Sequence, residues 1–168
     1  MRIPTNEEYN MLVETTCGEE SKMYWDQMYS WVNDTKAEYK LSMLSRADRG
    51  YFSASNWDFD SASSRLVYVG FRPAFEPLEV ETLAPQGELS IIGTLYMDGL
   101  PVEVPQKPKL RGDIATYIPS ARLEVRPPLG DPAYIITGFR VGNAVVADRV
   151  LLSRISYKNI EKALKISE

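Results

Sequence analysis

Residues 2–9, RIPTNEEY, decide how the chain begins to fold. Thr5 follows a proline and has Glu8 three residues later, which is the spacing of a capping box. In a capping box each of these side chains bonds the backbone N–H of the other residue, so a helix starts directly after Thr5. Gly18 is expected to end this helix. Its apolar residues at helical spacing are Tyr9, Leu12 and Val13.

A second informative stretch is residues 66–75, LVYVGFRPAF, which predicts one strand that contains Gly70 and ends near Pro73. Between the two stretches the pattern is weaker. Tyr24, Met28 and Trp31 fall on one helical face, which indicates a helix whose aromatic side is buried in the core. Residues 33–50 and 51–65 are polar and irregular, and we expect loops there.

The second half of the chain has the pattern of a β-structure. Residues 89–96 predict a strand, Asp98-Gly99 a tight turn, and residues 102–104 the returning strand. Three further strands are predicted at residues 123–125, 134–137 and 145–147. Residues 156–166 predict a short amphipathic helix with Ile160, Ala163 and Leu164 on one side. The chain is therefore expected to have an α+β fold, with a small antiparallel β-rich half that ends in a helix.

Four short stretches of the first half carry a family resemblance. RIPTNEEY (2–9) resembles the RLPTEAEW stretch of the formylglycine-generating-enzyme family, and VGFRP (69–73) resembles its closing GFR strand. YFSAS (51–55) and SAS (61–63) resemble the YWSS and SAY segments of its short bacterial and phage-borne versions. The landmarks match in order over residues 2–76. The resemblance implies a C-type-lectin-like fold: a helix after the Pro-Thr turn, long irregular loops and a small twisted antiparallel sheet.

The resemblance suggests two modules, a lectin-like one at residues 1–79 and a β-rich one of unrecognised type at 86–168. Family members carry a strand and a helix before the Pro-Thr turn, whereas this chain starts at the turn. That difference is expected to leave apolar surface open, and covering apolar surface is worth about 25 cal/mol per Å². We therefore expect the second half, or a second copy of the chain, to cover it.

Composition argues against catalysis. The 168 residues include no histidine, which removes the commonest general base and metal ligand. The formylglycine-generating enzymes use a pair of cysteines near the end of the fold, but the single cysteine here is Cys17 in the early helical region. Glu19 and Glu20 beside it are expected to raise the pKa of its thiol. The sequence therefore predicts that the protein is not an enzyme.

Charge indicates which partners and locations to expect. The formal net charge of -4 and a pI near 5.0 argue against binding to nucleic acid or to an anionic membrane. Residues 1–84 carry 8 Lys/Arg against 14 Asp/Glu, whereas residues 85–168 carry 11 against 9. This asymmetry favours packing between the halves or between copies, so we expect a homo-oligomer. The N-terminus does not have the pattern of a signal peptide, and we expect a cytoplasmic or virion location.

The candidate recognition segment is residues 51–64. Aromatic groups alternate there with small polar ones, which is the composition of binding loops, because aromatics give large contact area at low entropic cost. The alternative is that the aromatics fill a small core while the serines form turns. The candidate site residues are Tyr51, Phe52, Ser55, Asn56, Trp57, Asp58, Phe59, Asp60 and Ser64.

Asp58 and Asp60, together with Asn33 or Asp34, could offer oxygen ligands to calcium, an ion that lectin-type folds often hold. Calcium takes about six to eight oxygen ligands, and two loop aspartates supply few. The sequence therefore predicts no metal and no cofactor.

The leading functional hypothesis is a non-catalytic binding protein, encoded by a phage or prophage, that recognises a protein or a glycan through residues 51–64. Two alternatives remain open. The protein could be a structural or assembly component of a virion, in which both halves make subunit contacts. It could also be a phage inhibitor of a host defence enzyme, with which its small size and acidity are compatible.

Overall fold

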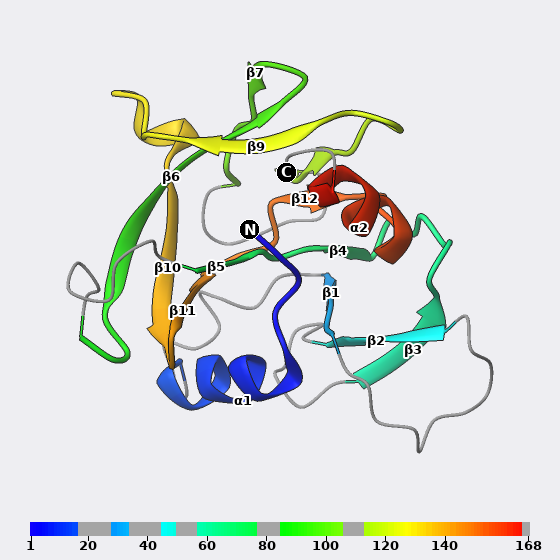
Figure 1. Ribbon diagram of the computed structural model, residues 1–168, viewed down its shortest axis with the longest axis horizontal. Coiled ribbons are helices and arrows are strands. Elements are labelled where there is room, and N and C mark those ends of the chain that lie inside the picture. Colours follow the sequence, from blue (N-terminus) through cyan, green and yellow to red (C-terminus); the bar gives the residue numbers. More distant parts are fainter. Residues whose placement is uncertain (17–27, 34–44, 50–56, 77–84, 106–112, 166–168) are drawn as a thin grey trace.

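The computed structural model describes residues 1–16, 28–33, 45–49, 57–76, 85–105 and 113–165. These residues form two α-helices, one 3-10 helix and twelve strands in two sheets, which is an α+β arrangement (Figure 1). In chain order the elements are α1 (Asn6–Thr15), β1 (Tyr29–Trp31), β2 (Ser45–Arg49), β3 (Trp57–Ser61), β4 (Val69–Phe71), β5 (Ala74–Phe75), β6 (Leu89–Met97), β7 (Leu100–Pro101), β8 (Ala115–Thr116), β9 (Leu123–Arg126), η5 (Pro132–Tyr134), β10 (Ile136–Val141), β11 (Ala144–Ala147), β12 (Leu152–Ser153) and α2 (Tyr157–Lys165).

The capping box predicted at the start of α1 is confirmed. The Thr5 hydroxyl accepts a hydrogen bond from the Glu8 backbone N–H at 3.2 Å, and the Glu8 carboxylate accepts one from the Thr5 N–H at 2.9 Å. Arg2 donates two further hydrogen bonds to the same carboxylate. The helix ends at Thr15, and Gly18 lies outside the described residues.

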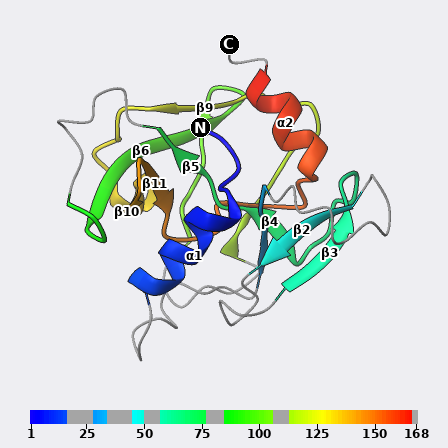
Figure 2. The same ribbon diagram turned by 60° about the horizontal axis from the view of Figure 1, so that its bottom comes forward.

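The first sheet has the strand order β3-β2-β1-β4-β12-β8. Figure 2 shows β2 and β3 on one side of the molecule and β10 and β11 on the other. The central strand β4 pairs in parallel with β1 and antiparallel with β12. β1 comes from the first half of the chain and β12 from its last twenty residues. Strand β4, which lies within the stretch 66–75, is therefore at the centre of this sheet.

The second sheet has the order β5-β11-β10-β6-β7, and β9 also pairs with β6. Helix α1 packs against its β10 and β11 strands, where Tyr9 and Leu12 are fully buried among Phe139, Val141 and Val146. Strand β5, from the first half of the chain, pairs with β11. Each sheet therefore contains strands from both halves.

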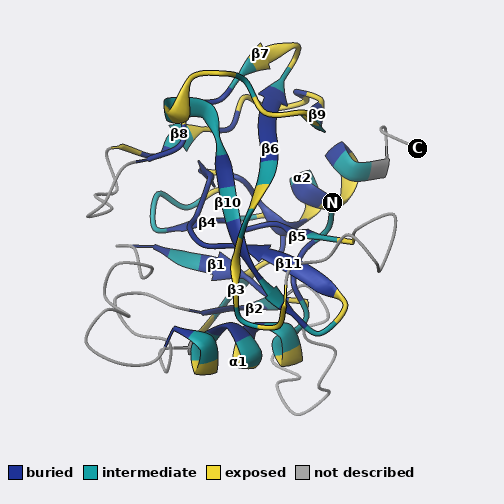
Figure 3. Cartoon of the chain, turned by 90° about the vertical axis from the view of Figure 1, so that its left-hand side faces the viewer, coloured by how far each residue is buried: buried dark blue, intermediate teal, exposed yellow. Residues whose placement is uncertain are grey.

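Both halves also contribute to the largest cluster of buried side chains. Trp31 on β1 is fully buried, its indole N–H donates a hydrogen bond to the Ile155 carbonyl at 2.8 Å, and its ring meets that of Tyr157 edge-on. Phe71 and Leu151 belong to the same cluster. In Figure 3, β4 and β11 are dark blue along their length, which marks them as buried. The predicted modules 1–79 and 86–168 thus share one core, and the second half covers apolar surface of the first.

The prediction of one strand over residues 66–75 is wrong. The chain forms β4, leaves the strand at Arg72-Pro73, and then forms β5 in the other sheet. Pro73 has no N–H to donate to a ladder, which favours a break at this point. The short span between the strands lets consecutive residues contribute to both sheets.

Three further expectations for the first half are wrong. Tyr29–Trp31 is strand β1 and not part of a helix, because its backbone pairs with β2 and β4. Residues 45–49 and 57–61, expected to be loops, pair with each other as β2 and β3. Charged and serine residues in these strands hid the pattern that marks buried strands.

Predictions for the second half hold more closely. The strand at 89–96 is β6, and the Asp98-Gly99 turn has positive φ angles of 50° and 80°, as a two-residue hairpin turn requires. The strand predicted at residues 134–137 begins only at Ile136, because η5 occupies the residues before it. α2 buries Ile160 and Ala163 as expected.

Gly70 in β4 provides a test of the close approach between β4 and β12. A Cβ atom at this position would overlap the Leu152 carbonyl oxygen and Cγ1 of Val150. We predict that Gly70→Ala lowers the free energy of unfolding by about 3 kcal/mol, the upper end of typical overpacking costs. Chemical denaturation measures this change.

Gly130→Ala is the matched control, because a Cβ atom there would meet nothing within 4 Å. Its free energy of unfolding should stay within about 0.5 kcal/mol of the parent value. Equal stabilities for the two variants would show that β4 and β12 do not approach as described.

Candidate functional site

The candidate recognition segment lies partly in a β-hairpin at the edge of the first sheet. Strands β2 and β3 pair antiparallel, with Asp48 opposite Asp58 and Arg46 opposite Asp60. Side chains alternate between the two faces of a strand, so these four residues share one face of the hairpin. Phe59 lies on the other face. Among the described strands β3 pairs with β2 alone, so it forms the edge of the sheet.

Arg49 anchors the other face of the hairpin to α1. Its guanidinium donates hydrogen bonds to the side-chain oxygens of Asn6 and Asn10 at 2.9 and 2.6 Å, and it lies 4.7 Å from the centre of the Tyr9 ring. The Tyr9 hydroxyl in turn donates to the Arg49 carbonyl. Strand β2 is therefore fixed to α1 through Arg49 and to β1 through backbone pairing.

Three carboxylates gather on the opposite face. Oxygen atoms of Asp48, Asp58 and Asp60 lie within 4.8 Å of one another. Asp48 is fully buried, Asp60 is half-buried and Asp58 is exposed. Both carboxylate oxygens of Asp48 and one of Asp60 are buried without a hydrogen-bond partner in the part of the chain that the structure describes. We name these three residues the carboxylate cluster.

Burial and mutual repulsion perturb the acidity of the cluster. The pKa of Asp48 is raised from 3.8 to about 8, first by burial and then by the negative charges of Asp60 and Asp58. The pKa of Asp60 is also raised, mainly by burial and then by the charge of Asp58. Like charges opposite each other destabilise a sheet, so the folded hairpin favours a proton or a cation at this place.

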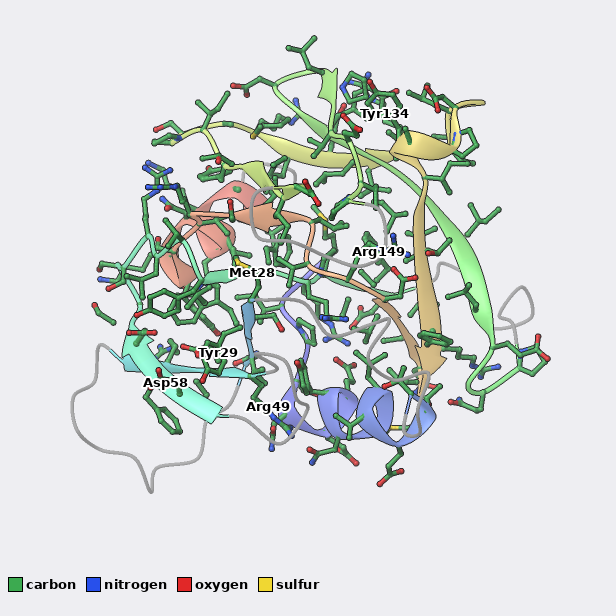
Figure 4. The ribbon with its side chains drawn as sticks, turned by 180° about the vertical axis from the view of Figure 1, so that it is seen from behind. Met28, Tyr29, Arg49, Asp58, Tyr134 and Arg149 are labelled. Carbon is green, nitrogen blue, oxygen red and sulfur yellow. The ribbon has the colours of Figure 1, made fainter. Side chains whose placement is uncertain are left out.

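Two aromatic residues border the cluster. The pKa of the Tyr68 hydroxyl is raised, first by its desolvation and then by the negative charges of Asp60, Asp58 and Asp48. The ring of Tyr29 meets that of Tyr68 edge-on, with centroids 6.4 Å apart. Figure 4 shows Tyr29 and Asp58 in the same part of the molecule, with Tyr134 at the opposite end.

The structure brings together only some of the predicted site residues. Asp58 and Asp60 are neighbours on one face of β3, Phe59 is half-buried on the other, and the Ser64 N–H bonds the Ser61 carbonyl in the turn after the strand. The backbone of Trp57 pairs with β2, and its side chain lies outside the description. The remaining candidates also fall outside the described residues: Tyr51, Phe52, Ser55 and Asn56.

Sequence reasoning missed Asp48 and Tyr68. A usable signal was present, because Arg46 and Asp48 in SRADR (45–49), like Asp58 and Asp60 in WDFDS (57–61), are charged residues two positions apart. Aligning them as a hairpin puts Asp48 against Asp58. Of the other residues considered for calcium, Asn33 instead accepts a hydrogen bond from the Tyr157 hydroxyl, and Asp34 lies outside the described residues.

Two cavities lined by described residues lie away from the hairpin. One of about 370 Å³ is lined by Met1, Phe75, Leu164 and residues 122–125, and another of about 400 Å³ borders Met11 and Gly87. Their few charged side chains do not form a cluster like that on β2 and β3. Neither α1 nor α2 combines the length and apolar character that a membrane-spanning helix needs.

Comparison with known proteins adds no relative: no family model, no curated protein and no solved structure matches the chain. The resemblance to the formylglycine-generating-enzyme family and the phage or prophage origin therefore stay predictions.

The raised pKa of Asp48 predicts how pH acts on stability. The folded state holds a proton that the unfolded chain releases near pH 4, so this group's contribution is present at low pH and is lost as pH rises toward about 8. We predict that, with a chelator present, Asp48→Asn is more stable than the parent protein at pH 8 by a few kcal/mol, since one pKa unit corresponds to about 1.4 kcal/mol. The advantage should shrink toward pH 4.

Asp113→Asn is the control, because Asp113 is exposed and lies just before β8, at the opposite edge of the same sheet. Denaturant unfolding between pH 4 and 8 gives the three profiles. Parallel profiles for the parent protein and Asp48→Asn would contradict a protonated, buried Asp48.

Proposed function

We propose that this protein is a non-catalytic binding protein that recognises a protein or a glycan through β3 and the candidate residues 51–56 before it. The observation that carries the proposal is the placement of β3. Among the described strands it is an edge strand, it carries the exposed Asp58, and the other strand of its hairpin is fixed by Arg49 and by β1. An exposed strand edge on a rigid base is a common docking element for partners.

The proposed absence of catalysis is supported by chemistry. The sequence contains no histidine and has one cysteine, so no Ser-His or Cys-His pair is possible. Asp48 has the perturbed acidity of a general acid, but its oxygen atoms are buried. A substrate atom could not come within the about 3 Å that proton transfer requires without opening the hairpin.

We propose in addition that residues 2–76 form a C-type-lectin-like module that is completed by the second half of the chain. The capped helix after the Pro-Thr turn and the central position of the Gly-Phe-Arg strand support this proposal. Strand β12 and the residues around Ile155 would then take the place of the elements that family members carry upstream.

One observation favours the alternative of an assembly protein. Leu89 and Ile91 lie on the same face of β6 and are 49% and 64% exposed, which is high for neighbouring apolar side chains on a strand. Such a pair suits a contact between subunits. The mass in solution separates the two roles, because a closed oligomer favours assembly and a monomer favours binding.

The binding function is tested by screening the full chain against a glycan array and a displayed peptide library. We predict ligands whose affinity falls at least about 30-fold in Trp57→Ala and in Phe59→Ala, since aromatic anchors of interfaces contribute about 2 kcal/mol or more. Tyr134→Ala is the matched control, a partly exposed aromatic on η5 at the far end of the molecule (Figure 4).

Circular dichroism and thermal unfolding establish that each variant is folded. If every ligand bound Trp57→Ala, Phe59→Ala and Tyr134→Ala equally well, β3 would not be the recognition surface. A screen with no ligand of either class would count against the binding function itself.

A further inference from the structure

The hydrogen bonding of the carboxylate cluster differs from that of Asp148, another buried carboxylate among the described residues. Asp148 is almost fully buried, and its two oxygens accept hydrogen bonds from Arg149 and from the Thr137 hydroxyl at 2.7 to 2.9 Å. Arg149 is satisfied in turn by the Pro105 carbonyl. Asp48 is at least as buried, yet neither of its oxygens has a hydrogen-bond partner among the described residues.

Asp48 lies in an environment where the lack of hydrogen-bond partners for its carboxylate is costly. The backbone of Asp48 stands opposite Trp31 on one side and opposite Asp58 on the other. Its carboxylate therefore faces the core side of the sheet, next to a fully buried indole. A buried polar group without a hydrogen-bond partner destabilises the folded state, and a charged group does so more strongly than a neutral one. A group that binds these oxygens would remove the cost.

The cationic side chain nearest in register is engaged elsewhere. Arg46 faces the same side of β2 and stands opposite Asp60, but its guanidinium lies over the Tyr157 ring, 5.1 Å from the ring centre. Both carboxylate oxygens of Asp48 and one of Asp60 stay without a hydrogen-bond partner among the described residues.

The geometry of the cluster fits a single ion. Ligand atoms on opposite sides of a calcium ion stand about 4.8 Å apart, because calcium–oxygen distances are about 2.3–2.6 Å. The three carboxylate oxygens lie within 4.8 Å of one another, so they could contact one ion without moving apart. Asp48 reaches it from the core, Asp60 from the middle of the hairpin and Asp58 from the solvent side.

We propose that Asp48, Asp58 and Asp60 form a binding site for one hard divalent cation, calcium or magnesium. The donor set supports this class of ion, because it consists only of carboxylate oxygens, which suit hard cations, and includes no nitrogen or sulfur, which zinc prefers. Three ionised carboxylates carry a formal charge of −3, which one divalent ion reduces to −1. The exposed side at Asp58 leaves coordination positions to water.

Such an ion would fasten the hairpin to the rest of the molecule. It would link β2, whose Asp48 pairs with the buried Trp31 of β1, to the edge strand β3. Among the described strands, β3 pairs with β2 alone. The site replaces the prediction of no metal made from the sequence, where only Asp58 and Asp60 could be paired. It does not depend on the identity of any binding partner.

The test uses the full chain, stripped with a chelator and titrated with CaCl2 or MgCl2 in a calorimeter. We expect one ion per chain and a rise in the melting temperature on saturation. Asp48→Asn and Asp58→Asn keep side-chain size and should each weaken binding at least about tenfold, since the number of charged ligands sets affinity in such sites. The exposed Asp113→Asn at the opposite sheet edge should bind within about twofold of the parent protein.

Terbium luminescence gives an independent readout. Excitation of Tyr68, whose hydroxyl senses all three carboxylates, should sensitise a bound Tb³⁺ ion, and Ca²⁺ or Mg²⁺ should displace it. Comparing the two displacement curves identifies the preferred ion. Asp58 is exposed, so Asp58→Asn stays informative even if Asp48→Asn does not fold.

Two results would overturn the proposal. The first is no saturable binding of either ion; if the pH dependence of Asp48 is observed in that case, the carboxylates share a proton and hold no metal. The second is equal binding by the parent protein and both hairpin variants, which would place the ion elsewhere.

Discussion

The pairing of β4 between β1 and β12 is the constraint on which the rest of the structure depends. Three buried residues, Val69–Phe71, join a strand from the first third of the chain to one from its end. Gly70 permits this approach because a side chain there would meet the backbone of β12. The buried indole of Trp31 then bonds the Ile155 carbonyl, so that core packing and backbone pairing hold the same two regions together.

The hairpin of β2 and β3 extends outward from this centre, and its two faces have different roles. One face is fixed to α1 by Arg49, which satisfies side chains and a tyrosine ring on the helix. The other face carries carboxylates whose repulsion opposes folding unless a proton or an ion is bound. The same element thus offers an exposed edge for a partner and a site that can control how firmly that edge is held. Binding of a partner and binding of an ion are separate proposals about neighbouring atoms.

Local signals in the sequence predicted local structure well. The Thr5/Glu8 capping box, the Asp98-Gly99 turn and the C-terminal helix all depend on contacts within a few residues, and all three are present. The errors concern contacts between distant residues. Tyr29–Trp31 was expected to be helical because Tyr24, Met28 and Trp31 have helical spacing, and pairing with β2 and β4 selects the strand. Asp48 was missed because its significance depends on the hairpin register with Asp58, which no local pattern contains.

Native-state hydrogen exchange tests most directly the claim that one shared core supports both sheets. If the claim is right, the slowest amides of β4, β11 and β12 exchange through one global opening, with the same free energy and the same dependence on denaturant. Gly70→Ala should then lower the protection of all three strands by the same amount. A lower opening free energy for β11 and its sheet than for β4, unaffected by Gly70→Ala, would show two independent units and contradict the account.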